Sequence, residues 1–283
     1  MTDPTTPKPR AFDMTLEIDA SQQDVWDALT KAEELVRWFP LQAEVTPGVG
    51  GSMRWAWGDS WNGIVRIDAW DPPRLLRLVD ENARPYDVNG KPVAADKASG
   101  SRVVVDVTLE TSGGRTTLRL VHSGFGTGAA WDDEVDGVSA GWQYELRSLR
   151  HYVTRHRGRA RAVAHARGSV AMPAGEVWSR LTSANGITVD AARLEEGRPY
   201  TATTANGDRF SGAIQLYIPH REFAGTSTEL ADGLFRICTY PAAGETGVIL
   251  WAVTYDGRSL AALEHRLQGM LDGLLVQTSI SNV

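Results

Sequence analysis

Seven residues of this sequence could form a chemical site in the interior of a folded domain: one histidine and six large aromatic side chains. They are Trp38, Phe39, Trp55, Trp57, Trp61, His122 and Trp142. Large aromatic rings fill ordinary protein cores, but each indole also carries an N–H group that needs a partner. The set is therefore compatible with a packed core and with a partly open aromatic cavity that binds a small hydrophobic molecule.

His122 ends a run in which apolar and polar residues alternate, with Leu118 and Leu120 as apolar members. Alternate side chains of a strand share a face, so the imidazole should point into the interior. There it could act as a general base or bind a ligand, or it could be a core histidine satisfied by its neighbours. The nearby acids are predicted at turns or on solvent faces and form no paired-carboxylate site: Asp59, Asp68, Asp71 and Asp106.

The sequence contains no other active-site signature in a suitable context. Phosphate-binding glycine loops, His-Glu-x-x-His helices, nucleophile elbows and Rossmann fingerprints are missing. The six histidines are scattered and Cys238 is the single cysteine, so no metal-ligand spacing and no disulfide are indicated. We therefore expect no metal and no cofactor, and a buried thiol at Cys238.

The elements that would position these residues occur twice along the chain. Residues 18–30 read IDASQQDVWDALT and residues 170–182 read VAMPAGEVWSRLT, and the two segments align without a gap. Each predicts a strand end, a turn and an amphipathic helix that starts near Gln22 or Ala174. Ser21 is suited to cap the first of these helices. The chain is therefore predicted to contain two copies of one domain.

Alternating apolar and polar residues predict antiparallel strands in both halves, each half closing with a long helix. In the first half the runs are residues 53–57, 61–69, 103–109 and 118–122, followed by a helix over 135–155. In the second half they are residues 200–205, 209–218, 223–228, 234–240 and 248–255, followed by a helix over 259–276. Asn206-Gly207 is a strong hairpin signal.

Two differences between the halves predict a division of labour. Trp38-Phe39 ends a short helical segment stopped by Pro40, and residues 81–101 are predicted to form an extended hairpin or a mobile flap. The second half has neither feature, so we expect the larger cavity in the first copy and a more nearly filled second copy. The predicted boundaries are a disordered N-terminus at 1–11, the first domain at 12–157, a basic linker at 158–164 and the second domain at 165–283.

Charge and hydropathy limit the partners. The net charge of −6 argues against nonspecific nucleic-acid binding. No apolar run reaches the roughly 18–20 residues of a membrane span, and the first residues do not resemble a signal peptide, so a cytoplasmic location is expected. A strip from Arg147 to Arg167 is rich in arginine and lacks acids. It can be a helix C-terminus with a solvated linker, or a docking strip for an acidic protein partner.

The order of these elements resembles the START-like, or SRPBCC, superfamily with its birch-pollen-allergen-like helix-grip fold. Within it, the first half is similar to the homologues of the activator of the heat-shock-protein-90 ATPase. The resemblance is carried by residues 21–30 (SQQDVWDALT), Trp38-Phe39, Gly50-Gly51, Gly63, residues 70–75 (WDPPRL), residues 122–125 (HSGF) and Gly141-Trp142. It implies an α+β fold of tandem helix-grip domains, each a curved antiparallel sheet around a long C-terminal helix with a mostly apolar cavity between them.

Three functions are compatible with this sequence. The first is the binding of a small hydrophobic or aromatic molecule in the first copy, which we favour because no catalytic motif is evident. The second is a cofactor-free cyclase, hydrolase or dehydratase that uses His122 in the same cavity. The third is a protein-interaction or chaperone-cofactor module, since the superfamily hosts many functions on one fold.

Overall fold

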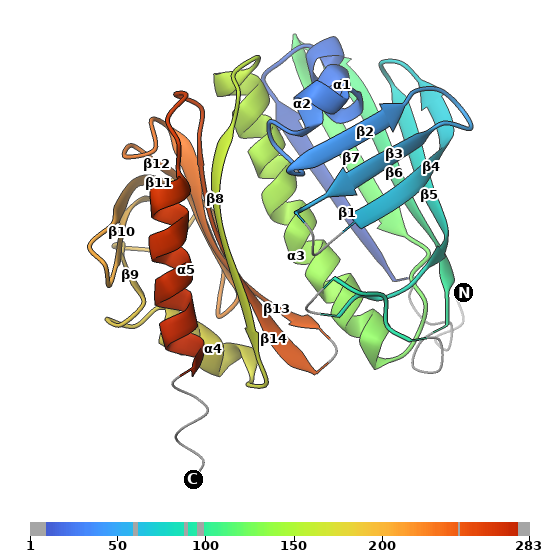
Figure 1. Cartoon of the computed structure of the whole chain (residues 1–283). Coiled ribbons are helices and arrows are strands. Elements are labelled where there is room, and N and C mark those ends of the chain that lie inside the picture. Colours follow the sequence, from blue (N-terminus) through green and yellow to red (C-terminus); the bar gives the residue numbers. More distant parts are fainter. Residues whose placement is uncertain (1–9, 59–61, 88–89, 95–98, 243, 277–283) are drawn as a thin grey trace, which may run out of the picture. The chain divides into compact units, whose positions relative to one another are not determined.

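The computed structural model describes residues 10–58, 62–87, 90–94, 99–242 and 244–276. Contacts within the chain divide it into two compact units, one up to Ser139 and one from Ala140. The division falls inside the long helix α3 (Ala129–His151) (Figure 1). Among the described residues, none of the helices combines the length and apolarity that crossing a bilayer requires. The domain boundaries expected from the sequence remain a prediction.

The first unit is a seven-stranded antiparallel sheet with two short helices and the beginning of α3. Its elements are β1 (Ala11–Ile18), α1 (Gln22–Thr30), α2 (Ala32–Leu35), β2 (Gln42–Thr46), β3 (Ser52–Ala56), β4 (Asn62–Asp71), β5 (Leu75–Ala83), β6 (Ser101–Ser112) and β7 (Arg115–Ser123). The strand order is β1-β7-β6-β5-β4-β3-β2, so the first strand pairs with the last. The predicted antiparallel sheet is confirmed.

The register of this sheet shows which side chains share its inner face. Phe12, His122, Val105, Leu78 and Ile67 form one row, each paired with the next across β1, β7, β6, β5 and β4. The last three of these residues are buried. The inner face is therefore the one predicted from the alternation of apolar residues, and His122 lies on it.

Helix α1 begins as the sequence predicts. The Ser21 hydroxyl accepts a 3.1 Å hydrogen bond from the backbone N–H of Asp24, which caps the first turn. Val25 and Trp26 are buried, and the Trp26 ring packs edge to face against Trp70 of β4 with 5.2 Å between centroids. The apolar side of the helix thus lies on the sheet.

The second unit repeats this strand order. After α3 come a π-helical turn η1 (Tyr152–His156), β8 (Ala162–Val170), α4 (Ala174–Leu181), β9 (Ile187–Asp190), β10 (Pro199–Thr204), β11 (Arg209–Ile218), β12 (Glu222–Ser227), β13 (Gly233–Ala242), β14 (Glu245–Thr254) and α5 (Ala261–Val276). Its sheet has the order β8-β14-β13-β12-β11-β10-β9. Trp178 of α4, like Trp26 of α1, is buried on the helix that follows the first strand. The two units therefore have the topology that an internal repeat predicts.

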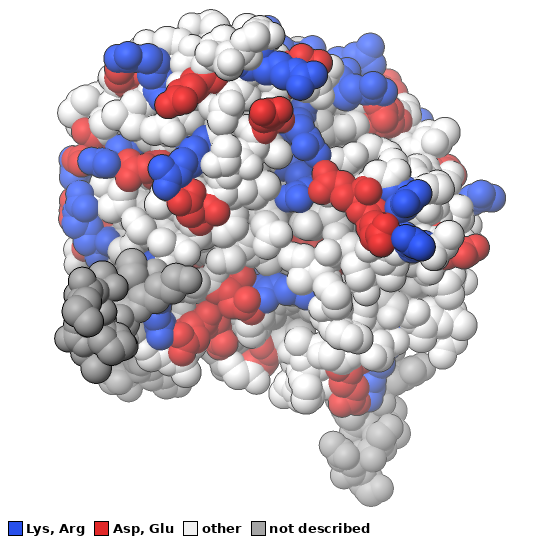
Figure 2. Space-filling model, turned by 180° about the vertical axis from the view of Figure 1, so that it is seen from behind, with Lys and Arg blue, Asp and Glu red and all other residues white. Residues whose placement is uncertain are grey.

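The surface carries both signs of charge in close proximity. Figure 2 shows one face of the molecule, on which acidic and basic side chains lie next to one another. Many of them form ion pairs along the strands, such as Arg77 with Asp106 and Arg119 with Asp13. This pattern is typical of a solvated surface.

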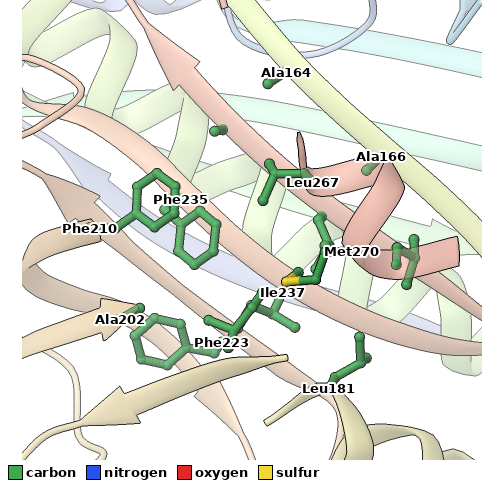
Figure 3. Packing of buried hydrophobic residues seen from close by; sticks show 14 of the residues in the cluster. Ala164, Ala166, Leu181, Ala202, Phe210, Phe223, Phe235, Ile237, Leu267 and Met270 are labelled. Atoms are coloured by element: carbon green, nitrogen blue, oxygen red, sulfur yellow. The ribbon is translucent and has the colours of Figure 1, made fainter. Parts of the chain in front are cut away.

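The core of the second unit is closely filled. Phe210 and Phe235 stack with 3.9 Å between ring centroids and 7° between planes, beside Phe223 and Met270 (Figure 3). Helix α5 runs along β8. It inserts the leucines predicted from its 3- and 4-residue spacing, all of them buried: Leu260, Leu263, Leu267, Leu271 and Leu274. The expected difference in cavity size between the two copies remains a prediction.

Strand β13 is also buried on its other side. Leu234, Arg236 and Cys238 alternate with the core residues Phe235 and Ile237, and all five are buried. Cys238 is a free, buried thiol, as predicted. The second sheet is thus covered on both faces along this strand.

The predicted long helix over residues 135–155 is wrong at both ends. Helix α3 already begins at Ala129, because Trp131 and the residues before Val135 pack into the first unit. It ends at His151, where the backbone widens into η1. Trp57 likewise lies just past the end of β3 and not in the strand.

Candidate functional site

Four of the seven predicted site residues form one aromatic cluster in the first unit, centred on Phe39. The Phe39 ring stacks on Trp38 at 5.0 Å and meets Trp55 and Trp57 edge to face at 5.2 and 4.9 Å between centroids. Trp38 and Phe39 follow α2, and the chain stops its helical turns before Pro40. Such edge-to-face geometry is favourable for aromatic rings, so these contacts stabilise the cluster.

The two buried indoles of this cluster differ in their hydrogen bonding. Nε1 of Trp38 donates to the carbonyl oxygen of Ala28 at 2.8 Å. Nε1 of Trp55 is buried and has no hydrogen-bond partner among the described residues. On the neighbouring strands, Trp55 pairs with the small residues Ala43 and Gly63. The Trp55 N–H is thus a hydrogen-bond donor on a strand whose neighbours carry small residues, Ala43 and Gly63, at the paired positions.

His122 lies on the same inner face as Trp55 but at a distance from it. Ile67 lies in the same cross-strand row as His122. On β4, Gly63 lies four residues before Ile67, so the two residues face the same side of the sheet. Gly63 pairs with Trp55 of β3, which therefore faces that side as well. Four strand steps separate β7 from β3. Since neighbouring strands lie about 4.8 Å apart, the separation is roughly 20 Å along the sheet. The predicted site is therefore divided into two parts.

The second part is a polar–aromatic group around Phe125. The His122 and Phe125 rings lie 4.7 Å apart, and Phe125 meets the Trp131 ring of α3 at 6.2 Å. Trp131 is buried against Val103, and its Nε1 donates to the carbonyl oxygen of Ser99 at 3.1 Å. These contacts fix the beginning of α3 against the ends of β6 and β7.

Glu134 adds an acid to this group, three residues after Trp131. Its Oε2 accepts a 3.0 Å hydrogen bond from the backbone N–H of Tyr86. Burial raises the pKa of Glu134 to about 7, and the hydrogen bond from Tyr86 only partly opposes that shift. A carboxyl group that titrates near neutrality can both give and take a proton.

Sequence reasoning missed Glu134, although a signal for it exists. Glu134 precedes Val138 and Trp142 by four and eight residues, so it lies on the same stripe of α3. An acid on an apolar stripe is a candidate for an interior group. The acids predicted near the site, by contrast, were all in strands or turns.

His122 has a different electrostatic character. Burial lowers its pKa to about 3. The imidazole is therefore neutral at physiological pH, where it can donate one hydrogen bond and accept another. It is a weaker base than the sequence interpretation required.

Comparison with known families decides what the first unit is related to. The model of the family "Activator of Hsp90 ATPase homolog 1-like protein" matches residues 19–154. The match starts after β1 and ends within η1. Residues 19–154 therefore match this family. The resemblance stated from the sequence is confirmed, and the aromatic cluster and the polar–aromatic group both lie in the family domain.

Solved structures resemble the chain at low sequence identity. DynU16, from the dynemicin biosynthetic locus, is 18% identical with a TM-score of 0.43, covering 96% of this chain and 97% of that chain. The di-domain ARO/CYC protein BexL of the BE-7585A biosynthetic pathway is 15% identical with a TM-score of 0.42, covering 95% and 94%. The Aha1 dimer from Colwellia psychrerythraea is 17% identical with a TM-score of 0.40, covering 52% and 98%. A search of curated proteins finds no match.

Two predicted site residues cannot be placed with the rest of the family domain's site. Trp61 lies outside the described residues. Trp142 is half-buried on the part of α3 that belongs to the second unit. Their membership of the ligand site remains a prediction.

The arginine strip that follows Trp142 in this family domain makes many contacts within the second unit. Arg147 and Arg150 pair with Glu196 at 3.1 and 3.2 Å, and Arg155 pairs with Asp232 at 2.9 Å. These contacts favour a structural role for the strip. An acidic protein partner remains a prediction.

Proposed function

We propose that the family domain in the first half binds a small hydrophobic or aromatic molecule that carries a hydrogen-bond acceptor. The observation that carries this proposal is the buried Nε1–H of Trp55 with no partner among the described residues. A buried unpaired donor costs about 1–3 kcal/mol, and such groups call for an explanation in a native protein. A ligand oxygen bonded to Trp55, with its apolar part against Phe39 and Trp57, would supply one.

Mass spectrometry of the purified protein under native conditions is the first test. A small molecule that copurifies, and is released on denaturation, supports the proposal. The test continues with 1-naphthol, an aromatic molecule with one oxygen, titrated by calorimetry. Absence of a copurified compound together with absence of 1-naphthol binding would contradict the proposal.

Trp55→Phe tests the donor itself. The substitution keeps an aromatic ring and removes the N–H, so 1-naphthol should bind about fivefold more weakly, the effect of one hydrogen bond of roughly 1 kcal/mol. Trp178→Phe removes a buried indole from the core of the second unit and is the matched control, with no change expected. Equal effects of both substitutions would mean that the loss is a general consequence of core changes.

A second candidate function is an acid–base reaction on the bound molecule, of the cyclase, hydrolase or dehydratase kind, without a cofactor. Glu134 favours it, because burial raises the pKa of this carboxyl to about 7 and it lies on α3 three residues after Trp131, in the polar–aromatic group of the same domain. In this reaction Glu134 takes over the role that the sequence assigned to His122.

Glu134→Gln separates catalysis from binding. If Glu134 transfers a proton, turnover of the copurified compound should fall about a hundredfold while its affinity stays the same. Asp136→Asn, an exposed acid on the same helix, is the control. Unchanged chemistry in Glu134→Gln would leave binding as the function. Protein interaction through the arginine strip has no supporting observation among the described residues.

A further inference from the structure

Three side chains of the second unit converge at the end of α3, although their spacing in the sequence gives no such indication. His151, His156 and Asp232 each direct a potential ligand atom to one place, with these atoms within 4.8 Å of one another. Both histidines are buried, with exposed fractions of 7% and 4%. The group lies outside the family domain's candidate site.

The π-helical turn η1 explains why the two histidines meet. In an α-helix, residues five apart are separated by about 140° around the axis and face different sides. In a π-helix the hydrogen bonds join residues i and i+5, so such residues lie above one another. His151 precedes η1 and His156 ends it, and their Nε2 atoms lie 3.2 Å apart. Single π-helical turns occur frequently at functional sites.

Asp232 reaches the histidines from a strained turn between β12 and β13. Both Ala231 and Asp232 have positive φ angles, 53° and 62°, which non-glycine residues rarely adopt. Such strain persists where the surrounding structure demands it, and it clusters at functional sites. The turn places the Asp232 carbonyl oxygen 2.6 Å from Nε2 of His151 and 2.8 Å from Nε2 of His156, and Oδ2 3.7 Å from Nε2 of His156.

We propose that His151, His156 and Asp232 form a binding site for a divalent transition-metal ion such as Zn²⁺. Zinc binds imidazole nitrogen at about 2.0–2.1 Å in tetrahedral geometry, which places two nitrogen ligands about 3.3 Å apart. The observed 3.2 Å between the two Nε2 atoms matches that spacing. The carboxylate of Asp232 is 39% exposed, and the three ligand atoms lie within 4.8 Å of one another, so this side chain must turn from Arg155 toward the imidazoles to take the third ligand position.

The surroundings of the group suit a metal centre. The Tyr255 ring stacks on His156 at 4.3 Å with 10° between planes, and the Tyr152 ring stacks on Tyr255 at 6.0 Å between centroids. An apolar shell of this kind limits solvent access and strengthens coordination. Nε2 of His156 contacts the Asp232 carbonyl oxygen, whereas its Nδ1 is buried without a hydrogen-bond partner among the described residues, so the protein satisfies only one nitrogen of this ring.

Substitution of Arg155 should change the metal affinity in a predictable direction. Its Nε donates to Oδ2 of Asp232 at 2.9 Å, the same oxygen that faces His156. A metal ion must share this oxygen with the guanidinium and is repelled by its charge. Arg155→Gln should therefore strengthen metal binding, whereas a merely structural role of Arg155 predicts no such gain.

The experiment uses the full-length protein, treated with a chelator and dialysed. Co²⁺, which replaces Zn²⁺ and absorbs visible light when coordinated, is titrated first, and Zn²⁺ affinity is then measured by calorimetry. We expect one ion per chain, a visible Co²⁺ spectrum, at least tenfold weaker Zn²⁺ binding in His156→Gln and Asp232→Asn, and tighter binding in Arg155→Gln. His265→Gln alters an exposed histidine of α5 and should change nothing.

Three results would overturn the site. The first is the absence of a stoichiometric Co²⁺ spectrum in the unaltered protein. The second is an unchanged Zn²⁺ affinity in His156→Gln and Asp232→Asn. The third is a loss of Zn²⁺ affinity in His265→Gln as large as the loss in those two variants. Circular dichroism of each metal-free variant identifies any variant that fails to fold. The Co²⁺ spectrum needs no variant, so the proposal can be rejected even if the substitutions destabilise the chain.

Discussion

The backbone N–H of Tyr86 donates a 3.0 Å hydrogen bond to the carboxylate of Glu134. This bond joins the connection between β5 and β6 to the first turns of α3. A second bond, from the Trp131 indole to the carbonyl of Ser99, joins the same two segments. The segment predicted from the sequence as a hairpin or flap is, in its described residues, held against the helix that closes the site.

Glu134→Gln should change how stability depends on pH. The pKa of Glu134 is about 7 in the folded protein and about 4.5 without burial. Between these values the folded state holds more protons, so this carboxyl makes the protein less stable as pH rises. Glutamine has no such penalty and can still accept the bond from Tyr86.

Urea denaturation at pH 5 and pH 8 measures this effect. The free energy of unfolding of the variant, relative to that of the unaltered protein, should rise by roughly 1–3 kcal/mol between pH 5 and pH 8. It should rise no further above pH 8. A difference that is the same at both pH values would show that Glu134 is ionised normally in the folded protein.

Trp57→Ala and His122→Gln should affect binding unequally. Removing the Trp57 ring removes apolar contact worth about 2 kcal/mol, or roughly thirtyfold in affinity. Glutamine can replace one hydrogen bond of His122, so His122→Gln should reduce the affinity less than Trp57→Ala does. Because the pKa of His122 is about 3, His122→Gln should have the same effect at pH 6 and pH 8.

Calorimetric titration of the copurified compound into both variants provides the measurement. If turnover is detected and falls about a hundredfold in His122→Gln with affinity intact, then His122 and not Glu134 carries the proton. Normal binding and turnover in both folded variants would mean that these rings form only a core.

Arg236→Met should destabilise the second unit strongly. Arg236 donates to Glu222 at 2.6 Å, both side chains are buried, and the Arg236 guanidinium lies 4.1 Å above the Tyr144 ring. Burial raises the pKa of Glu222, and Arg236 opposes that shift. Loss of one partner leaves a buried carboxylate unpaired, which costs about 3–5 kcal/mol.

A double substitution tests this reasoning. Arg236→Met combined with Glu222→Gln removes both charges. The free energy of unfolding, measured by urea denaturation, should therefore fall less in this double variant than in Arg236→Met alone. Arg180→Met breaks an exposed pair with Glu176 on α4 and should cost less than about 0.5 kcal/mol. An additive double substitution would show that the two charges do not interact.

Ser21→Ala should lower the free energy of unfolding by about 1 kcal/mol. The Ser21 hydroxyl caps α1, whereas the equivalent position before α4 is Pro173, which makes no side-chain cap. Ser21→Asp should restore the stability, since aspartate caps equally well. Thermal or urea unfolding of the three proteins gives the comparison, and equal stability of all three would mean that the cap is dispensable.

Local patterns predicted most of the fold because each element depends mainly on its own residues. The strand over 209–218 is found as β11, and the leucine stripe of α5 is buried as expected. The alternation of Val103, Val105 and Val107 correctly placed the inner face of β6. The spacing of apolar residues and the residue types in the turns are sufficient to predict such elements.

The sites were less predictable because they depend on long-range or irregular structure. Nothing in the spacing of His151 and His156 predicts a π-helical turn, and Asp232 joins them only through the pairing of β12 with β13. Arg236 and Glu222 are charged strand residues that the sequence analysis did not single out, and residues of α3 after Ala140 contact Arg236. A contact made by distant segments leaves little trace in either segment alone.

The pairing of the first strand with the last has a consequence for synthesis of the chain on the ribosome. Asp13 on β1 forms its ion pair with Arg119 on β7, 106 positions further along. At about 5–20 residues per second, β1 emerges roughly 5–20 s before its partner exists. During that time it is an unpaired edge, and its exposed acids Asp13 and Glu17 provide the charge that deters pairing with other nascent chains.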